Sequence, residues 1–506
     1  VVIEIHETNQ AVLSNNDGFY EFKNIKPGSY HIHCNMIGFH SESFQIEIKE
    51  NTNFDVQMHE SANELHEVVI ESNLQKQSEK ESSVAIERVD KEFFQKNTGT
   101  TFMATLEKLP GVSSINMGVG ISKPVIRGLS FNRVVVSDYG IKQEGQQWGS
   151  DHGLEIDQYN IDNVEILKGP ASLMYGSDAM AGVVAITHPK NMPQNTHSGY
   201  IQTILRTNND TYGLTANAKG NANGINYKIQ LTGLDYADYR VPANSFVYQG
   251  FRFPIVENRL KNTAGNEKHV NFTVGINKNW GYSHFTISNF NQNAGLFAGA
   301  IGRPQFYKLT DDGNWRDINL PSQNINHFKV INNTNIKLKN NWLELDFGYQ
   351  NNYRQENSLP HAHGQGPAAV GTKAVAFQLQ TLSLNSRFYT KNFKILDAIF
   401  GLQSSFQNNK ISGYEFLIPN FNYFQMGAFV IEKYKINPQL FVNAGARLDF
   451  AALQTQSTQV AVYDNPRNPI NFIGFQTRNE ALDKLWANVS FSTGLSYLPN
   501  EWLKLK

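Results

Sequence analysis

A chain of 506 residues is too long for one compact domain. Its net charge of −1 at pH 7 excludes a general affinity for nucleic acid, and its single cysteine, Cys34, excludes an internal disulfide and any metal site built from several cysteines. No apolar run reaches about 18 residues, which excludes a membrane-spanning helix. The strands of a membrane β-barrel need no such run, because they alternate between apolar and polar residues.

The first 58 residues are expected to form a small β-sandwich. Four segments alternate like strands between Asn/Gly and Pro/Gly turns: Val1–Ile5, Tyr20–Phe22, Tyr30–Asn35 and Phe44–Ile48. His31 and His33 could hold a metal together, although paired surface histidines are the default. The order DGFYEF, IKPGSYHIHC and GF is similar to the carboxypeptidase-regulatory-like domain. Because residues 1–58 contain no catalytic constellation, we interpret this domain as a spacer or docking module.

Residues 59–91 are rich in Ser and Glu and contain no aromatic residue, which is typical of a linker. They include one β-branched run, Glu64-Leu65-His66-Glu67-Val68-Val69-Ile70. In polar surroundings such a run suits a strand that pairs with the sheet edge of another protein. The alternative is the first buried strand of the domain that follows.

Residues 92–192 carry the most informative motifs. Leu109-Pro110-Gly111-Val112 follows a helix candidate, and Val125-Ile126-Arg127-Gly128-Leu129 precedes an apolar strand. Asn163–Ile186, NVEILKGPASLMYGSDAMAGVVAI, then combines a strand, a Gly-Pro break and a small-residue run. An ordinary α/β segment could have the composition of this last stretch. In order and spacing, however, the motifs together resemble the plug domain of TonB-dependent outer-membrane receptors.

The resemblance implies an α+β plug inside an antiparallel transmembrane β-barrel, in the outer membrane of a Gram-negative bacterium, and a receptor rather than an enzyme. It identifies residues 64–70 as the TonB box, which a TonB-type energising protein in the periplasm captures by strand addition. A carboxypeptidase-regulatory-like domain before the plug is typical of Bacteroidetes-type receptors.

A polar, Gly-rich loop between Tyr139 and Asp157 has little use in an ordinary globular domain. In the receptors that this chain resembles, loops from this part of the plug rise toward the outer face and touch the ligand. The candidate ligand contacts are therefore Gln146, Gln147, Trp148, Asp151 and His152. The alternative for Trp148 is packing against the barrel wall. Arg127 and Glu165 are expected to pair with the barrel instead.

Residues 193–506 alternate with a period of two, as in Ile225–Leu231, where apolar residues oppose Asn226, Lys228 and Gln230. A soluble sandwich would alternate in the same way. The connections, however, are short and long in turn, as in outer-membrane barrels, and Trp280, Trp342 and Trp502 lie beside short turns as an aromatic girdle would. We expect about twelve strands. Since the barrel of this family has about 22 strands, about half of it is expected here.

The long loops are expected to carry the ligand specificity. His361 and His363 lie one residue apart in a Gly/Pro-rich loop and could bind one metal ion together with a third ligand such as His152. The alternative is an ordinary polar loop. A second loop, residues 294–327, has mixed aromatic and charged character, with Phe297, Arg303, Tyr307 and Trp315 as candidate substrate contacts. The Gln-Trp and His-Ala-His features resemble a metal-uptake subgroup of these receptors.

The sequence therefore predicts an energy-coupled importer of a metal-containing nutrient, such as an iron–siderophore complex, with zinc or haem as the alternative cargo. A non-transporting surface-binding protein is the alternative of another class, but it would need neither plug nor TonB box. Asp311 and Asp312 lack a partnering base or nucleophile, so no enzyme activity is expected. The expected partners are the TonB-type protein, outer-membrane lipid and the metal complex. No permanent cofactor and no nucleic acid are expected.

Overall fold

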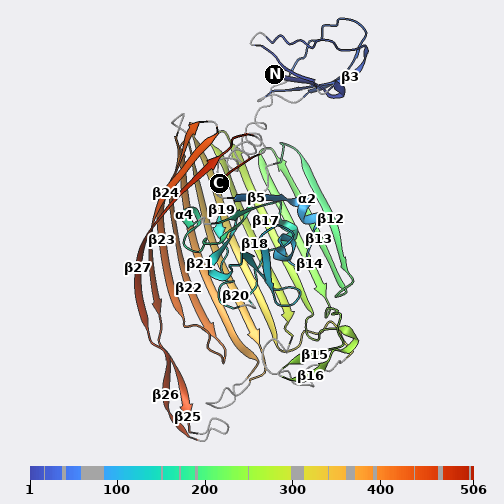
Figure 1. The fold of residues 1–506 in the computed structure, drawn as a ribbon. Coiled ribbons are helices and arrows are strands. Elements are labelled where there is room, and N and C mark those ends of the chain that lie inside the picture. The colour runs from blue at the N-terminus through green and yellow to red at the C-terminus, as the bar shows by residue number, and fades with distance from the viewer. Residues whose placement is uncertain are drawn as a thin grey trace. The chain divides into compact units, whose positions relative to one another are not determined.

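The computed structural model describes residues 1–8, 10–15, 18–36, 42–58, 85–149, 152–169, 172–188, 192–248, 250–297, 313–339, 341–360, 371–390, 396–437, 439–464, 471–500 and 503–506. The chain divides into two compact units, Val1–Lys80 and Glu81–Lys506 (Figure 1). The second unit contains a mixed α+β domain, the plug, and a large antiparallel sheet, the barrel sheet. No helix in this part of the chain is long and apolar enough to cross a membrane.

The first unit is built on a four-stranded sheet with the order β2-β1-β3-β4. Its elements are β1 (Val2–Ile5), η1 (His6–Thr8), β2 (Gln10–Leu13), β3 (Gly28–Asn35) and β4 (Glu42–Ile48). Ile3, Ile5 and Cys34 are among the residues buried in its core, following the two-residue period of a strand. The strand expected at Tyr20–Phe22 is not formed, and the hydroxyl of Tyr20 donates a 2.5 Å hydrogen bond to the carbonyl of Phe54.

The paired histidines of β3 make ordinary surface contacts. The Nδ1 atom of His31 lies 2.6 Å from Oε1 of Glu7, and the Nδ1 atom of His33 lies 2.7 Å from the hydroxyl of Ser43. Across the described residues of the chain, no group of three or more His, Cys, Asp or Glu side chains could hold a metal ion. These contacts support the default interpretation of paired surface histidines.

The plug contains a five-stranded sheet with the order β5-β10-β11-β8-β9 and a separate hairpin, β6-β7. Its strands are β5 (Ala85–Asp90), β6 (Val112–Asn116), β7 (Ser122–Ile126), β8 (Val134–Asp138), β9 (Ile141–Lys142), β10 (Asn163–Lys168) and β11 (Gly182–Thr187). Its helices are α2 (Lys91–Lys96), α3 (Phe102–Leu106), α4 (Ser172–Tyr175), η2 (Phe131–Arg133) and η3 (Gln158–Asn160). The apolar core lies between this sheet and the helices.

The plug begins earlier than the boundary at residue 92 that the sequence suggested. Strand β5 pairs antiparallel with β10 along its whole length, from Ala85 opposite Lys168 to Asp90 opposite Asn163. This strand could not be told from the linker by composition, because only Val89 of β5 is buried and the partner strand lies more than 70 residues away.

Local chemistry defines the ends of the plug elements. The side chains of Asp90 and Thr101 accept hydrogen bonds from backbone N–H groups three residues ahead, and so begin α2 and α3. Gly182 begins β11 with a φ of +158°, and a Cβ atom there would lie 2.2 Å from the carbonyl oxygen of Leu167. Only glycine permits β10 and β11 to approach this closely.

The barrel sheet has twelve strands, and Figure 1 shows it curving around the plug. In sheet order they are β12 (His197–Arg206), β13 (Thr211–Ala222), β14 (Ile225–Tyr236), β17 (Gly265–Lys278), β18 (Gly281–Gly295), β19 (Ser322–Leu338), β20 (Asn341–Asn357), β21 (Lys373–Thr390), β22 (Leu396–Ser412), β23 (Phe421–Asn437), β24 (Leu440–Thr455) and β27 (Leu482–Tyr497). Among the described strands, β12 and β27 are the two edges of this order.

The connections are short at one end of the barrel sheet and mostly long at the other, as expected. Two long connections contain hairpins of their own, β15-β16 (Ser245–Tyr248 and Phe251–Pro254) and β25-β26 (Thr458–Tyr463 and Phe472–Asn479). The first also contains a short 3-10 helix, η4 (Val256–Asn258). We call the two ends of the sheet the short-turn end and the long-loop end.

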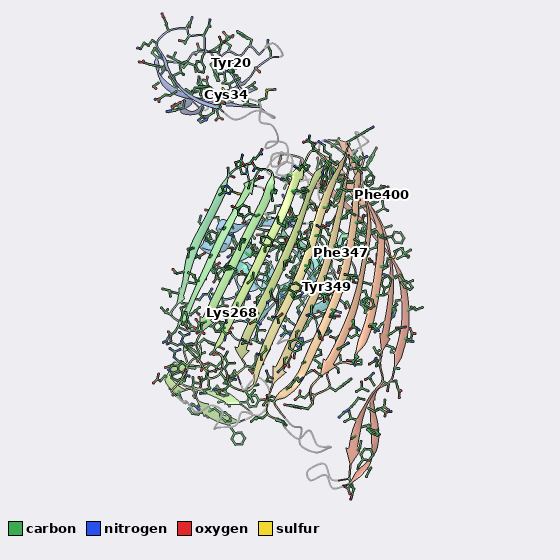
Figure 2. The ribbon with its side chains drawn as sticks, turned by 180° about the vertical axis from the view of Figure 1, so that it is seen from behind. Tyr20, Cys34, Lys268, Phe347, Tyr349 and Phe400 are labelled. Carbon is green, nitrogen blue, oxygen red and sulfur yellow. The ribbon has the colours of Figure 1, made fainter. Side chains whose placement is uncertain are left out.

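The two faces of the barrel sheet have the reverse polarity of a soluble protein. Val270, Phe272 and Phe347 are 49%, 38% and 41% exposed on the outer face, and Figure 2 shows Phe347 and Phe400 there. The alternate residues, such as His269 and Thr273, are buried on the inner face. Apolar residues outside and polar residues inside confirm the prediction of a membrane barrel over a soluble sandwich.

The aromatic girdle is only partly as expected. Trp280 is 41% exposed beside its short turn. Trp342, by contrast, lies opposite Tyr389 on the same face as Glu344, and its ring stacks on Tyr389 with 4.7 Å between centroids. The prediction that Trp342 belongs to the aromatic girdle is therefore wrong, because the strand register directs its side chain toward the lumen. Trp502 lies outside the described residues.

A lysine on the outer face should weaken the barrel. We expect Phe347→Lys to lower the free energy of unfolding in lipid by about 2–4 kcal/mol, since it puts a charge into hydrocarbon. Phe347→Leu, which keeps the position apolar, should stay close to the parent. Urea unfolding in lipid vesicles measures both variants, and equal stability for the lysine and leucine variants would contradict the assignment of this face to lipid.

Candidate functional site

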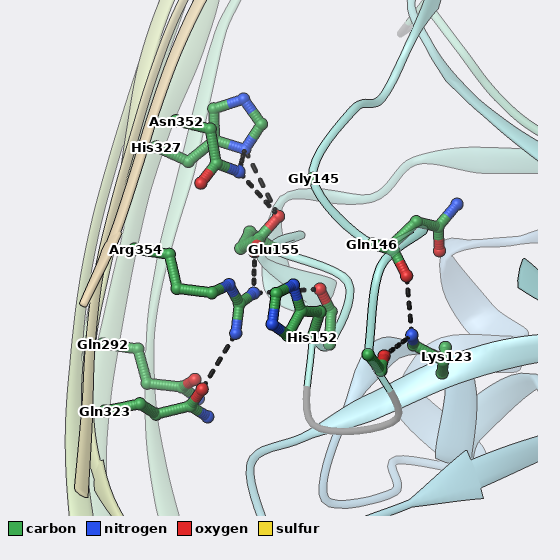
Figure 3. Close-up of polar contacts among 12 residues, drawn as sticks. Lys123, Gly145, Gln146, His152, Glu155, Gln292, Gln323, His327, Asn352 and Arg354 are labelled. Atoms are coloured by element: carbon green, nitrogen blue, oxygen red, sulfur yellow. Dashed lines mark hydrogen bonds and ion pairs between the residues drawn. The ribbon is translucent and has the colours of Figure 1, made fainter. Parts of the chain in front are cut away.

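Many buried polar side chains lie at the contact between the plug and the inner face of the barrel sheet. Figure 3 shows its central part, where the plug segment that leads from Gly145 to Glu155 lies beside β19 and β20. The strand residues in contact there lie near the long-loop end, because β19 begins at Ser322 and β20 ends at Asn357. The loop predicted to rise toward the outer face therefore lies at the level of the long loops.

Lys123 fastens this loop to the plug. Its side chain is fully buried, and its ammonium group donates a 2.6 Å hydrogen bond to the carbonyl of Gln146 and another to the carbonyl of Gly149 (Figure 3). The ammonium also lies 4.3 Å from the centre of the Phe131 ring. A buried cation that binds two carbonyl groups of one loop fixes the path of that loop.

Trp148 and His152 lie against the barrel wall. The Trp148 ring centroid is 5.1 Å from that of Phe377 on β21 and 6.5 Å from that of Phe421 on β23. His152 is 1% exposed, and its Nε2 atom lies 3.0 Å from Oε1 of Glu356 on β20. The structure thus has the alternative arrangement for Trp148, and contact of either residue with a ligand remains a prediction.

The two glutamines of the loop have different surroundings. Gln147 turns back on its own loop, where its side chain accepts from the N–H of Gly145 at 2.9 Å and donates to Glu144 at 3.1 Å. The side-chain oxygen of Gln146 is buried without a hydrogen-bond partner among the described residues. Of the two, Gln146 has the free acceptor that a ligand could use.

A buried ion pair joins the loop to the barrel. Glu155 of the plug and Arg354 of β20 are each 1% exposed, and Nη2 of Arg354 donates to Oε1 of Glu155 at 2.5 Å (Figure 3). The other guanidinium nitrogen, Nη1, donates to Gln323 at 2.8 Å. Asn352 donates to Oε2 of Glu155 at 3.3 Å, and Nδ1 of His327 lies 3.4 Å from the same oxygen. Both carboxylate oxygens are therefore bound by barrel side chains.

This environment changes the acidity of Glu155. Burial alone would raise the pKa of its carboxyl group, but the hydrogen bond with His327 and the charge of Arg354 lower that pKa to about 2. The group is consequently a carboxylate at every physiological pH. Removing either partner of such a pair leaves the other as an uncompensated buried charge.

Other strands hold the plug by similar polar contacts. Lys228 of β14 pairs with Asp162 at 2.5 Å, and Lys329 of β19 pairs with Asp138. Several barrel side chains donate instead to plug carbonyl groups, within 3.0 Å in each case: Arg206 to Gly99, Asn333 to Tyr139, Gln350 to Lys142, Asn385 to Gly140, Gln403 to Met174 and Arg447 to Leu173. The plug is therefore held to the barrel mainly through hydrogen bonds and ion pairs.

A polar cleft of about 110 Å³ lies between the plug and strands β21 to β24. The plug contributes Lys142, which bridges Glu144 at 2.9 Å and Asp178 at 2.7 Å. The barrel side includes Gln425 and Arg447. Since each cation is beside a carboxylate, the cleft suits water and polar solutes rather than an apolar ligand.

The outer-loop candidates form a separate cluster. Phe297 packs edge-to-face on Phe246 of β15 at 5.2 Å, and Trp315 lies 5.3 Å from the guanidinium of Arg259. These residues contact the β14–β17 connection, whereas Trp148 and His152 contact β20, β21 and β23. Asp151, Arg303, Tyr307, His361, His363 and the TonB box, residues 64–70, lie outside the described residues.

Two expected plug–barrel pairs are wrong. Glu165 pairs with Arg88 of the plug at 2.8 Å, and Arg127 is exposed at a turn with a φ of +51°. The plug–barrel ion pairs that do form include Glu155–Arg354, Lys228–Asp162 and Lys329–Asp138, and none of them was expected from the sequence. Alternation in the sequence places the charged Arg354 on the inner face of its strand, and this was the available signal for a plug contact. The residue that pairs with it could not be identified from sequence spacing.

Two family models match the N-terminal part of the chain. Residues 78–183 match the family model of the TonB-dependent receptor plug domain, and residues 1–70 match that of the CarboxypepD_reg-like domain. Both matches confirm the resemblance on which the sequence analysis relied.

Curated relatives share part of the chain. It is 30% identical over 159 residues to the vitamin B12 transporter BtuB of Vibrio vulnificus, covering 31% of this chain and 25% of that protein. It is 33% identical over 131 residues to the heme/hemopexin utilization protein C of Haemophilus influenzae, covering 25% of this chain and 16% of that protein. The chain thus matches about a quarter or less of the length of these relatives, which are a transporter and a utilization protein rather than enzymes.

Solved structures share the fold over most of the chain. The ferric yersiniabactin uptake receptor FyuA of Yersinia pestis aligns with a TM-score of 0.58 and 14% identity, over 84% of this chain and 64% of that one. The hemophore receptor HasR of Serratia marcescens, solved with its hemophore and heme, aligns with a TM-score of 0.61 and 13% identity, over 84% and 63%. At this identity the likeness shows the fold alone, a plug domain within a large β-barrel.

The Glu155–Arg354 pair predicts a pH dependence. The folded protein holds the pKa of Glu155 near 2, below its ordinary value of 4.5, so its stabilisation is complete above pH 4.5 and is lost as the pH falls toward 2. Over this window we expect the parent to lose about 3 kcal/mol more stability than Glu155→Gln.

Unfolding midpoints measured between pH 2 and 6 test this expectation. Glu257→Gln, which removes an exposed carboxylate from an outer loop, serves as the control and should follow the parent. If Glu155→Gln also followed the parent, the ion pair would not contribute as described.

Proposed function

We propose that the chain serves as an energy-coupled outer-membrane receptor that imports a metal-containing nutrient, with an iron–siderophore or other metal complex as its cargo. Its plug domain and barrel fold are those of TonB-dependent receptors. The names of its relatives mention vitamin B12, heme and hemin, and those of its structural neighbours ferric yersiniabactin and copper. All of these are metals or metal complexes, which supports this class of cargo.

The observation that carries the proposal is the polar attachment of the plug inside the barrel. The Glu155–Arg354 and Lys228–Asp162 pairs hold the plug at two different strands. Water can replace each of these bonds when the plug is displaced, so a pull from the periplasmic side can exchange these polar contacts for water as the lumen opens. A surface-binding protein without transport would have no use for a displaceable plug, which disfavours that alternative.

The direction of the pull follows from the TonB box. Leu65–Ile70 precede β5, and β5 pairs directly with β10 in the plug sheet. A periplasmic partner that adds a strand to this segment can therefore transmit force into the plug through β5. The ligand contacts would lie at the other end, on Gln146, Trp148 and His152.

Zinc is the second candidate cargo, and the His361-Ala362-His363 sequence favours it. Imidazole suits zinc, copper, iron and nickel, and two ligands need a third to make a site. The outer aromatic cluster around Phe297 and Trp315 favours a bulky complex instead. The two cargoes thus depend on different loops, and substitutions can separate them.

Deletion of Leu65–Ile70 should abolish uptake and leave ligand binding unchanged, because this segment contacts the energising partner and not the cargo. Cells that depend on the receptor for the limiting nutrient would report uptake as growth, and binding would be measured on the purified protein. Deletion of Ser72–Gln77, six mostly polar linker residues next to the box, is the length-matched control. Normal growth on the limiting nutrient by cells whose receptor lacks residues 65–70 would contradict the assignment of the TonB box.

The metal site is tested with zinc and with an iron–siderophore complex, each measured by calorimetry on the purified full-length protein. If the loop histidines bind metal, His361→Ala with His363→Ala should weaken zinc binding at least tenfold, since two ligands are lost. The same change at His31 and His33, a histidine pair of identical spacing, is the control. Unaltered binding of zinc and other transition metals would remove the histidine site and leave the aromatic loop as the better candidate.

A further inference from the structure

Two histidines meet where the end of the plug sheet lies against the barrel wall. His188 directly follows β11, the middle strand of the plug sheet. His284 is buried on the inner face of β18, while its neighbour Phe285 is exposed on the outer face. The centres of the two imidazole rings are 5.6 Å apart, and the ring planes are tilted by 48°. One imidazole thus belongs to the plug and the other to the barrel.

Aromatic packing holds both rings in position. The His188 ring stacks on Tyr139 with 4.4 Å between centroids, because the two residues follow neighbouring parallel strands, β11 and β8. The His284 ring stacks on Tyr282 at 4.9 Å. It also lies over Gly275 of β17, where the Cβ atom of any other residue would collide with it. The orientation of the two imidazoles is therefore fixed before any ligand arrives.

A third polar side chain completes the group. Asn333 of β19 lies directly opposite His284 in the strand register and close to the His188 ring. Its amide nitrogen already donates to the carbonyl of Tyr139 at 2.7 Å and to Asp346 at 2.6 Å. Its side-chain oxygen is buried without a hydrogen-bond partner among the described residues, and so are both ring nitrogens of His188. Buried polar atoms are seldom left in this state unless something binds them.

The atoms that remain suit a cation. A neutral imidazole has a lone pair on one nitrogen, and Asn333 has only its oxygen left to offer. The charged groups that act on His188 are members of ion pairs, so that their charges largely cancel: Asp138 with Lys329, Arg387 with Asp346 and Lys228 with Asp162. The ligand is therefore selected by lone pairs and not by net charge.

The geometry indicates which cations fit. Imidazole nitrogen is a preferred ligand of late transition metals, whereas magnesium and calcium prefer oxygen ligands. An ion at about 2.0–2.1 Å from one nitrogen of each ring would place the ring centres about 5–6 Å apart. The observed separation of 5.6 Å lies in this range. We propose that His188 and His284, with Asn333 as the third ligand, bind one late transition-metal ion such as zinc or copper.

The position of this site separates it from the outer loops. His284 lies three residues after the start of β18, beside the short turn that joins β17 to β18, and the short turns of such barrels face the periplasm. The plug segment from Gly145 to Glu155 lies toward the long-loop end instead. An imported ion would therefore reach the two histidines only after it had passed most of the plug.

The two imidazoles belong to parts that a pull on the plug would separate. His188 continues β11, which pairs with β10, and β10 pairs with β5. Displacement of this sheet would move His188 away from His284 and Asn333, so the ion would lose one nitrogen ligand and leave on the periplasmic side. A site of two histidines and one amide also binds weakly enough to let an ion go. This role in release rests on the proposed function, whereas the binding of the ion does not.

Anomalous diffraction from crystals of the full-length protein soaked in zinc chloride tests the position of the ion. We expect a zinc peak between the His188 and His284 rings, at about 2.0–2.3 Å from one nitrogen of each. The peak should disappear in His188→Ala and in His284→Ala. Zinc peaks elsewhere in the parent with none between these rings, or a peak that persists in either variant, would overturn the proposal.

Calorimetry with zinc on the purified protein in detergent tests the affinity. The background lacks the other two histidine pairs, through alanine at His31, His33, His361 and His363. In this background His188→Ala and His188→Gln should each weaken one zinc-binding event roughly tenfold or more, since one of two nitrogen ligands is lost. His188→Gln keeps a polar side chain of similar size, so it separates the loss of a ligand from a failure to fold.

The control for calorimetry is His197→Ala, which removes a barrel histidine whose Nδ1 atom lies 2.8 Å from the hydroxyl of Tyr227. It should keep the affinity of the background protein. Equal zinc affinity in the background and in His188→Gln, or an equal loss in His197→Ala, would overturn the proposal. Neither measurement involves uptake, so the metal site and the TonB-box assignment can fail independently.

Discussion

In the barrel sheet, backbone groups pair with neighbouring strands and side chains are divided between lipid and lumen. Lipid accepts only the apolar set, so the polar set must face inward, where Lys228, His327 and Arg354 lie. These inward groups need polar partners, and the plug supplies them through Asp162, Glu155 and its own carbonyl groups. The requirement that lipid places on one face of the sheet therefore determines the chemistry of the plug on the other.

The fold could be predicted from the sequence because its signals are local. Alternation in strands such as Ile225–Leu231, and the succession of short and long connections, indicated a membrane barrel without any information on distant contacts. The plug was identified by motifs in a fixed order. Strand β5 was missed because its composition resembles the linker before it and its partner, β10, is distant in sequence.

The site could be predicted only in part, because its contacts join residues far apart in the chain. The resemblance to TonB-dependent receptors indicated that the loop with Trp148 and His152 lies toward the long-loop end. It could not show that Glu155 pairs with Arg354, 199 residues away, or that Glu165 pairs within the plug. Strand register decides these pairings, and a register shift of one residue would exchange the lipid and lumen faces.

Lys123 has a consequence for the behaviour of the loop under load. Its ammonium group is fully buried and is held by the carbonyl groups of Gln146 and Gly149. The loop is thus bonded to β7, and the barrel wall holds its far side through His152 and Glu155. A force applied to the plug sheet would load both sets of bonds at the same time. The loop would therefore keep its position until the bonds at one of its two ends break.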